Sequence, residues 1–241
     1  MKRLFDIIVS TIGIVICFPI LLIFTLLIWF YDFHNPFYVA NRVGKGHVTF
    51  KMIKFRSMNI NADKSGVVST SSNDSRLTPI GKFIRKHKID EIIQLLNVLK
   101  GDMSLIGPRP NVWDEVHLYT NEEKMILTIK PGITDMSSIV FSDLNDILQE
   151  YEDLNLAYNQ LVRPWKSRLG ILYIENQSFL LDIKILLLTV LSLFSKKQSL
   201  KYLQVILHKM NVNSILIEVC KRTNKLFPYP PPGQTEIILD R

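Results

Sequence analysis

The chain of 241 residues has few of the residues on which several classes of protein depend. Its two cysteines, Cys17 and Cys220, stand far apart, and Cys17 lies within an apolar run. A disulfide framework is therefore not expected, and a reducing, cytosol-facing domain is the simpler interpretation. The five histidines are scattered, with no H-E-x-x-H spacing and no paired-cysteine zinc spacing beside them. The sequence also lacks the G-x-x-x-x-G-K-[ST] and G-x-G-x-x-G loops, which excludes the usual loop motifs for nucleotide phosphates.

Positive charge exceeds negative charge in this chain. The formal net charge is +7, while apolar residues make up 47% and charged residues 21% of the sequence. These proportions do not indicate disorder, and the length suggests one domain or one domain with an appendage. The positive charge favours an anionic partner, which nucleic acid, anionic lipid or a phosphorylated substrate would satisfy. No nucleic-acid-binding motif or aromatic platform accompanies the charge, so no nucleic-acid partner is expected.

The N-terminal segment is almost continuously apolar from Phe5 to Phe30. At about 1.5 Å per residue, this run can span roughly 30 Å of hydrocarbon. No A-x-A-like site follows it, which argues against a signal peptide. Pro19 interrupts the run, and basic residues flank both ends, so the positive-inside tendency places both ends in the cytosol. A re-entrant helix–break–helix and a Pro-kinked spanning helix fit these features equally well.

The middle of the chain carries clear signals for local structure. Residues 36–58 alternate apolar and basic residues around glycines, which predicts short strands and turns, and residues 59–77 predict a loop. Thr78-Pro79 is typical of an N-cap followed by a proline in the first turn, and Lys100-Gly101 is typical of a helix end. We therefore expect one bent helix or two short helices between these two signals, with Asp90 and Glu91 at the joint.

The second half of the chain is predicted to be mostly helical. Residues 121–129 and 143–162 have a helical pattern, whereas residues 102–110 favour a strand and a turn. A second apolar run extends from Phe179 to Phe194 and carries a polar stripe at helical spacing. It predicts either a helix in the membrane interface or a buried core helix, and the pattern does not separate the two.

Asp90 and Glu91 form an acidic pair in a strongly basic neighbourhood. A carboxylate can attack phosphorus and form an acyl phosphate, and a second carboxylate can hold Mg²⁺ beside a diphosphate. Taken alone, the pair is most often a solvated helix end. The turn Gly107-Pro108-Arg109-Pro110 fixes one arginine, whose planar fork suits phosphate. The other candidate phosphate-binding cations are Lys54, Arg56, Arg85 and Lys130, which could equally rest on anionic lipid.

Taken together, these segments resemble the bacterial sugar transferase family, the monotopic phosphoglycosyl transferases that start polysaccharide or glycan assembly. The similarity runs from Lys2 to about Lys201 and includes the proline-broken membrane run. The long central stretch is highly specific, and the shorter segments occur in the expected order. The segments are KRLFD, NRVGKG, KFRSM, TPIGKFIRK, IDEIIQLLNVLKGDMSLIGPRP, KPGITD and SFLLDIKI.

The resemblance implies a reaction and a role for each site residue. Asp90 would be the nucleophile that takes a sugar phosphate from a nucleotide sugar, with UDP the expected nucleotide, and releases a nucleoside monophosphate. Glu91 would help to hold the cofactor Mg²⁺, and Arg109 would bind the phosphates of the nucleotide sugar. Polyprenyl (undecaprenyl) phosphate would then attack the intermediate and leave as a polyprenyl diphosphosugar. Pro19 would mark the break of a re-entrant membrane helix.

The resemblance also implies the architecture and the location. We expect an α+β, mostly helical fold: a single small cytosolic catalytic domain with short strands, on a re-entrant anchor and interfacial amphipathic helices. The expected bounds are 1–34 for the anchor, 35–205 for the catalytic domain and 206–241 for a C-terminal extension of unknown role. The protein would lie on the cytoplasmic face of the bacterial inner membrane and supply downstream glycosyltransferases of exopolysaccharide, capsule or O-antigen assembly.

One departure from the family pattern concerns the sugar. Many members continue KPGIT with glycine, whereas this chain has Asp135 followed by SSIVFSDLND. This segment resembles that of a sub-branch of the family, and we expect it to bear on the choice of sugar.

Two other functions remain as hypotheses. The first is a catalytically inactive membrane adaptor on the same fold, but a binding role would not need Asp90, Glu91 and Arg109 together. The second is a membrane-tethered nucleic-acid-binding protein, which only the positive charge suggests.

Overall fold

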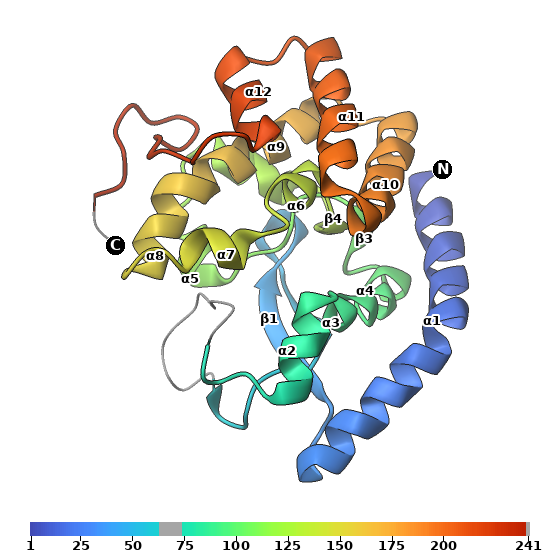
Figure 1. Cartoon of the computed structure of the whole chain (residues 1–241). Coiled ribbons are helices and arrows are strands. Elements are labelled where there is room, and N and C mark those ends of the chain that lie inside the picture. The colour runs from blue at the N-terminus through green and yellow to red at the C-terminus, as the bar shows by residue number, and fades with distance from the viewer. Residues whose placement is uncertain (63–73, 240–241) are drawn as a thin grey trace.

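The computed structural model describes residues 1–62 and 74–239, so most of the loop predicted at 59–77 lies outside the described residues. The described part is mostly helical with a few short strands, which confirms the predicted α+β class (Figure 1). Strands β1 (Phe37–Val43) and β2 (Thr49–Phe55) form an antiparallel hairpin around the short turn η1 (Lys45–His47). Strands β3 (Ser104–Ile106) and β4 (Gly132–Thr134) pair in parallel.

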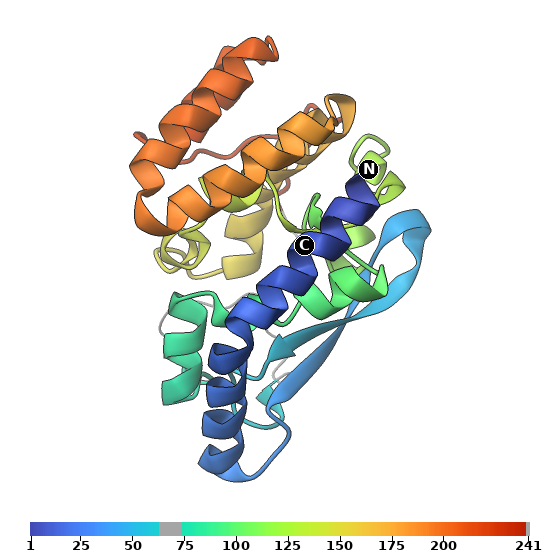
Figure 2. The same cartoon turned by 90° about the vertical axis from the view of Figure 1, so that its right-hand side faces the viewer.

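Helix α1 (Lys2–Asp32) contains the whole apolar run and remains helical through Pro19. It bends part-way along its length, as Figure 2 shows, so the proline coincides with a bent helix and not with a non-helical interruption. Most of its large apolar side chains are exposed. Among the described residues, α1 is the one helix that is long and apolar enough to cross a membrane.

Polar contacts fix the first turns of α1 against the rest of the protein. The Lys2 ammonium donates to the Asp182 carboxylate at 2.7 Å and to the Ile106 carbonyl at 3.0 Å. The Asp6 carboxylate is buried and accepts a hydrogen bond from the Leu105 backbone N–H at 3.1 Å. A buried carboxylate needs such partners, so these residues tie the start of α1 to β3 and to α10 (Phe179–Phe194).

Three short helices follow one another between the two predicted signals: α2 (Pro79–Lys86), α3 (Ile89–Ile92) and α4 (Leu95–Lys100). Thr78 caps α2 by accepting a hydrogen bond from the Gly81 N–H at 2.9 Å, and Gly101 ends α4 in the left-handed region with a φ of 97°. Both predicted boundaries are confirmed. Lys88 also has a left-handed backbone, with a φ of 56°, and it separates α2 from α3.

The main hydrophobic core lies among the helices of the second half. Trp165, Leu169 and Tyr173 of α9 (Arg163–Glu175) are buried there with Met136 and Ile139 of α6 (Met136–Val140). These side chains pack the helices into one body with β3. The elements of this part are α5 (Trp113–Val116), η3 (Glu123–Thr128), α6 (Met136–Val140), α7 (Leu144–Leu148), α8 (Leu154–Ala157), the π-helix η4 (Tyr158–Val162) and α9 (Arg163–Glu175).

Helix α10 (Phe179–Phe194) has two contrasting faces. Leu181 and Ile185 are buried in the core, whereas Leu187 and Phe194 are exposed. The buried face confirms the core-helix interpretation, and the membrane-interface interpretation remains a prediction for the exposed face. Helices α11 (Lys196–Lys209) and α12 (Ser214–Lys221) follow, and both contribute buried side chains to the same core.

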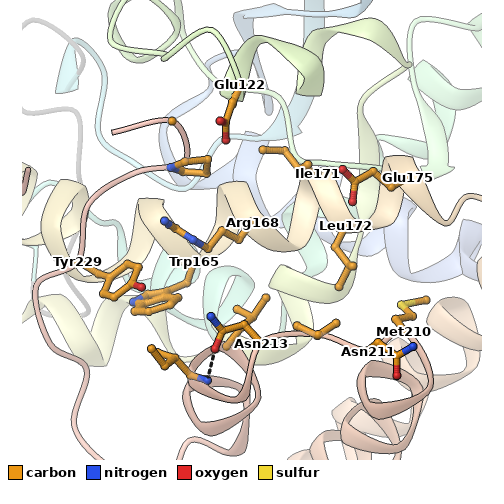
Figure 3. A pocket seen from close by; sticks show the side chains of 15 residues that line it. Glu122, Trp165, Arg168, Ile171, Leu172, Glu175, Met210, Asn211, Asn213 and Tyr229 are labelled. Atoms are coloured by element: carbon orange, nitrogen blue, oxygen red, sulfur yellow. Dashed lines mark hydrogen bonds between the residues drawn. The ribbon is translucent and has the colours of Figure 1, made fainter. Parts of the chain in front are cut away.

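The C-terminal segment crosses the outer surface of α9 (Figure 3). The rings of Trp165 and Tyr229 lie with their centroids 4.3 Å apart, and Arg168 donates to the Pro230 carbonyl at 2.9 Å. A cavity of about 410 Å³ lies between α9, the α11–α12 connection and this segment. The residues after 205 thus pack on the helices that also form the candidate site.

Candidate active site

A pocket of about 350 Å³ lies where the β1–β2 hairpin, α2, α3 and the Pro108–Pro110 turn meet α5, α7, η4 and α9. Its walls carry six cationic side chains and three acidic ones. The excess of positive charge makes it suitable for a ligand with several negative charges. The charged residues are Arg42, Lys54, Arg85, Lys88, Arg109 and Lys166, with Asp90, Glu91 and Glu115.

Helix α3 presents Asp90 and Glu91 to this pocket. Ile89 of α3 and the residue that caps its C-terminus, Ile93, are buried in a small core with Phe55, which leaves the acidic residues on the side that faces the pocket. The Asp90 side chain accepts no hydrogen bond from the residues that the structure describes. Burial raises the pKa of Asp90, the charge of Glu91 raises it further, and the nearby cations only partly oppose this.

Glu91 is held by Arg109 through two hydrogen bonds, of 2.6 Å and 2.9 Å. Arg109 also donates to the Ile133 carbonyl at 3.0 Å, which fixes the guanidinium against β4. Burial alone would raise the pKa of Glu91, but the charges of Arg109 and Lys54 lower it to about 2. Glu91 is therefore a permanent carboxylate beside Asp90 at neutral pH.

Lys54 and Arg85 reach the same acidic pair from other elements. Lys54 comes from β2, and Arg85 comes from the last turn of α2, where its Nε donates to the Ser57 hydroxyl at 2.9 Å. Burial lowers the pKa of both side chains, and the carboxylates of Asp90 and Glu91 partly offset that effect. Five of the residues singled out from the sequence thus meet in one pocket: Lys54, Arg85, Asp90, Glu91 and Arg109.

Three other residues singled out from the sequence lie elsewhere. Arg56 pairs with Asp32 at 2.5 Å, at the end of α1. Lys130 is exposed and does not line the pocket. Pro19 lies within α1 and does not line the pocket either. Arg56 and Lys130 therefore do not join the cations around Asp90 in this structure.

Several pocket residues were not predicted from the sequence. Arg42 and Lys88 add positive charge, and Glu115, Tyr158 and Lys166 line the pocket from α5, η4 and α9. Arg42 and Lys88 lay within basic segments that already suggested a phosphate role. Nothing in the sequence around Tyr158 or Lys166 distinguishes them, because only the packing of α9 brings them to Arg109.

The larger cavity beside the C-terminal segment has a different character. Its walls combine the apolar side chains Leu172 and Met210 with the charged side chains Glu122, Arg168 and Glu175 (Figure 3). None of the predicted site residues lines it. The pocket that contains Asp90 is therefore the candidate active site.

Comparison with known proteins identifies the family of the chain. The model of a family described as bacterial sugar transferase matches residues 1–196. The chain belongs to the bacterial sugar transferase family. This match covers α1, the β1–β2 hairpin, every residue of the candidate pocket and α10. Helix α12 and the C-terminal segment lie outside it.

Curated relatives of this bacterial sugar transferase come from several bacteria. A Bacillus subtilis protein, provisionally named an undecaprenyl-phosphate N-acetylgalactosaminyl 1-phosphate transferase, is 50% identical over 109 residues, which cover 45% of this chain and 61% of the relative. The uncharacterized sugar transferase EpsL of B. subtilis is 38% identical, over 79% of this chain and 85% of the relative. The UDP-N-acetylgalactosamine-undecaprenyl-phosphate N-acetylgalactosaminephosphotransferase of Aeromonas hydrophila is 35% identical, over 78% of this chain and 42% of the relative. The chain thus spans less than two thirds of the first and third of these relatives.

Proposed function

We propose that this protein transfers a sugar 1-phosphate from a nucleotide sugar, with UDP as the nucleotide, to a polyprenyl phosphate such as undecaprenyl phosphate. The observation that carries this proposal is the position of buried Asp90 and half-buried Glu91 in a pocket whose walls carry six cations. A diphosphate ester matches that charge, and a carboxylate without a hydrogen-bond donor among the described residues is suited to attack phosphorus. The relatives named as undecaprenyl-phosphate sugar phosphotransferases also support it.

In the proposed first step, a carboxylate oxygen of Asp90 attacks the phosphorus that carries the sugar. The bond from that phosphorus to the oxygen of the nucleoside monophosphate breaks, and the nucleoside monophosphate leaves. In the second step, an oxygen of polyprenyl phosphate attacks the same phosphorus. The bond to Asp90 breaks, the carboxylate is restored, and a polyprenyl diphosphosugar leaves. Arg109, Lys54 and Arg85 hold the phosphate oxygens during both steps.

The side chains present fit Mg²⁺ as the cofactor. Among the described residues, no three or more His, Cys, Asp or Glu side chains group into a metal cage. Mg²⁺ needs no such cage, because it commonly binds one or two carboxylates together with substrate phosphates and water. Glu91 would hold it, because a carboxylate has about four lone-pair positions and Arg109 occupies two. The ion would neutralise charge on the diphosphate.

We further propose that α1 enters and leaves one leaflet of the bacterial inner membrane, with the catalytic domain on the cytoplasmic face. A straight helix of 31 residues would be roughly 46 Å long, enough to separate its ends across a bilayer. Both ends of α1 instead contact the catalytic domain, through Lys2 and Asp182 at one end and through Asp32 and Arg56 at the other. Modification of a cysteine placed at residue 1 by a periplasmic thiol reagent would contradict this topology.

The test of the reaction compares two matched carboxylate variants in detergent or nanodiscs. Asp90→Asn should abolish the Mg²⁺-dependent release of nucleoside monophosphate, whereas Asp114→Asn should not, because Asp114 is exposed and does not line the pocket. Without polyprenyl phosphate, the intact wild-type protein should gain the mass of one sugar phosphate, and Asp90→Asn should not.

Full turnover by Asp90→Asn would rule out the covalent route. A folded wild-type protein that releases no nucleoside monophosphate from any nucleotide sugar would favour the inactive adaptor. If the protein is active, its product would be the substrate of glycosyltransferases that extend a bacterial surface polysaccharide.

A further inference from the structure

Lys166 lies at the boundary between the active-site pocket and a small neighbouring cavity. It belongs to the first turn of α9, directly after the π-helix η4. Lys166 and Arg109 both line the pocket, and both line the neighbouring cavity of about 30 Å³. The Lys166 ammonium lies 5.4 Å from the centroid of the Tyr158 ring, and it forms no ion pair or hydrogen bond with a side chain that the structure describes. A π-helix beside a pocket is a frequent feature of functional sites.

The two walls of the pocket differ in chemistry. The wall formed by the hairpin, α2 and α3 carries Arg42, Lys54, Arg85 and Lys88 around the acidic pair. The opposite wall is mixed, with a single cation among apolar, amide, hydroxyl and acidic side chains. It consists of Val112, Glu115, Ser142, Leu144, Asn145, Leu148, Tyr158 and Lys166. The first wall suits phosphates, and the second suits an uncharged polar group.

The position of Lys166 decides which part of a nucleotide sugar it can meet. The attacked phosphorus must lie beside Asp90, with its oxygens on Arg109. The sugar ring is joined to that phosphate by a single oxygen, whereas the base is separated from it by a second phosphate and a ribose. Because Lys166 neighbours Arg109, a sugar carried by that phosphate can reach Lys166 and the mixed wall. Its substituent at carbon 2 is the one nearest to the transferred phosphate.

The mixed wall offers the three contacts that an acylamino group requires. Lys166 can donate to the acyl carbonyl oxygen, Glu115 can accept from the amide N–H, and Leu144 and Leu148 can contact the methyl group. A hydroxyl group at the same carbon has no methyl group, so it would not contact Leu144 and Leu148. Burial lowers the pKa of Lys166 to about 8, with a further contribution from the charge of Arg109, so most molecules carry the ammonium at pH 7.

We infer that Lys166 is a specificity-determining residue of this transferase and that the donor carries a 2-acylamino sugar. This inference rests on the proposed function and adds the class of sugar to it. It also places the segment after Asp135, which supplies Ser142, Leu144, Asn145 and Leu148, in the sugar-facing wall.

The experiment measures kcat/KM for four donors: UDP-N-acetylglucosamine, UDP-N-acetylgalactosamine, UDP-glucose and UDP-galactose. The wild type should prefer the N-acetyl donors by at least about tenfold, which corresponds to one hydrogen bond to a charged group. Lys166→Met should lower kcat/KM for the N-acetyl donors by about tenfold and leave the hydroxyl donors nearly unchanged. Lys166→Arg should keep part of the preference. Lys124→Met is the matched control, because Lys124 is exposed on η3 and does not line the pocket.

Three results would overturn the inference. A wild type that prefers UDP-glucose or UDP-galactose would exclude a 2-acylamino sugar, whether or not the variants fold. An equal loss with all four donors in a folded Lys166→Met variant would place Lys166 on the shared nucleotide or phosphates. An unchanged preference in that variant would remove its role in specificity. If the proposed reaction itself were wrong, the wild type would release no nucleoside monophosphate from any donor, which is a different outcome.

Discussion

Arg109 and Glu91 form a two-pronged ion pair. The Nη1 atom of Arg109 donates to Oε2 of Glu91 at 2.9 Å, and its Nη2 atom donates to Oε1 at 2.6 Å. The pair joins the turn after β3 to helix α3, and Arg109 adds a third hydrogen bond to the Ile133 carbonyl of β4. One side chain therefore sets the distance between the acidic pair and the parallel strand pair. The pKa of Arg109 is raised by the charge of Glu91, so the guanidinium stays charged.

Arg109→Lys should lower kcat/KM by about 10- to 100-fold although the positive charge remains. A lysine cannot make two parallel hydrogen bonds, and each lost bond to a charged group weakens transition-state binding by about 1.5–3 kcal/mol. Nucleoside monophosphate release at several donor concentrations measures this change. Arg168→Lys removes a guanidinium outside the pocket and should leave kcat/KM within about twofold. Equal activity of Arg109→Lys and the wild type would show that the fork is not needed.

Gly132→Ala should disrupt the site from a distance. A Cβ at Gly132 would lie 2.1 Å from the Gly107 nitrogen, so β4 would have to move away from β3. Gly107 begins the turn that carries Arg109, and we therefore expect at least a tenfold loss of kcat/KM and a lower Tm. Gly170→Ala is the matched control, because its Cβ would meet its nearest neighbours at 3.5 Å, an ordinary contact distance. Because Gly170 lies within helix α9, where alanine is more favourable than glycine, Gly170→Ala should leave Tm unchanged or raise it slightly. The two alanine variants behaving alike would argue against the steric explanation.

Local signals predicted the parts of the fold that depend on neighbouring residues. The Thr78 cap, the Gly101 helix end and the β1–β2 hairpin all lie where turn chemistry and alternation place them. The division into α2, α3 and α4 was only partly predicted. The break between α2 and α3 depends on Lys88 in a left-handed conformation, which a non-glycine residue seldom adopts, so the sequence carries no signal for this break.

The acidic pair shows how far the site could be predicted. Asp90 and Glu91 as a dipeptide indicate little, and only their resemblance to a family motif separated their expected roles. Positive charge alone could not distinguish Lys54, which lines the pocket, from Lys130, which does not. Lys166 could not be predicted, because 56 intervening residues must fold before it neighbours Arg109.

Lys2 and Asp182 should contribute to stability as a pair. The Asp182 side chain is 2% exposed, and it also accepts a hydrogen bond from the Tyr173 hydroxyl at 2.5 Å. Lys2→Met leaves that carboxylate without its cation, which should cost about 3 kcal/mol and lower Tm by about 6–12 °C. Combining Lys2→Met with Asp182→Leu should cost less than the sum of the single changes. Lys184→Met, an exposed lysine on the same helix, should not change Tm. If the stability losses of the two single variants, measured by thermal unfolding, added up to the loss of the double variant, Lys2 and Asp182 would not be coupled.

The pH dependence of donor selection should follow the charge of Lys166, whose pKa burial lowers to about 8. The ammonium is present below that pH and lost above it. Because the neutral side chain should keep about a tenth of the activity, as in Lys166→Met, kcat/KM for an N-acetyl donor should be nearly level from pH 6.5 to 7.5 and fall about threefold between pH 8 and 9. Of the groups around Lys166, Glu91 stays ionised in this range, and burial raises the pKa of Tyr158. The charges of Arg109, Asp135 and Glu115 also act on Lys166.

Lys166→Arg supplies the control for this pH profile. A guanidinium stays charged through pH 10, so the fall in kcat/KM between pH 8 and 9 should disappear in that variant. The profile should remain flat around pH 7. UDP-galactose should show no such fall even with the wild type, because its carbon 2 carries no acyl group to accept from Lys166. A fall of the same size in Lys166→Arg, or with every donor, would assign the alkaline limb to another group.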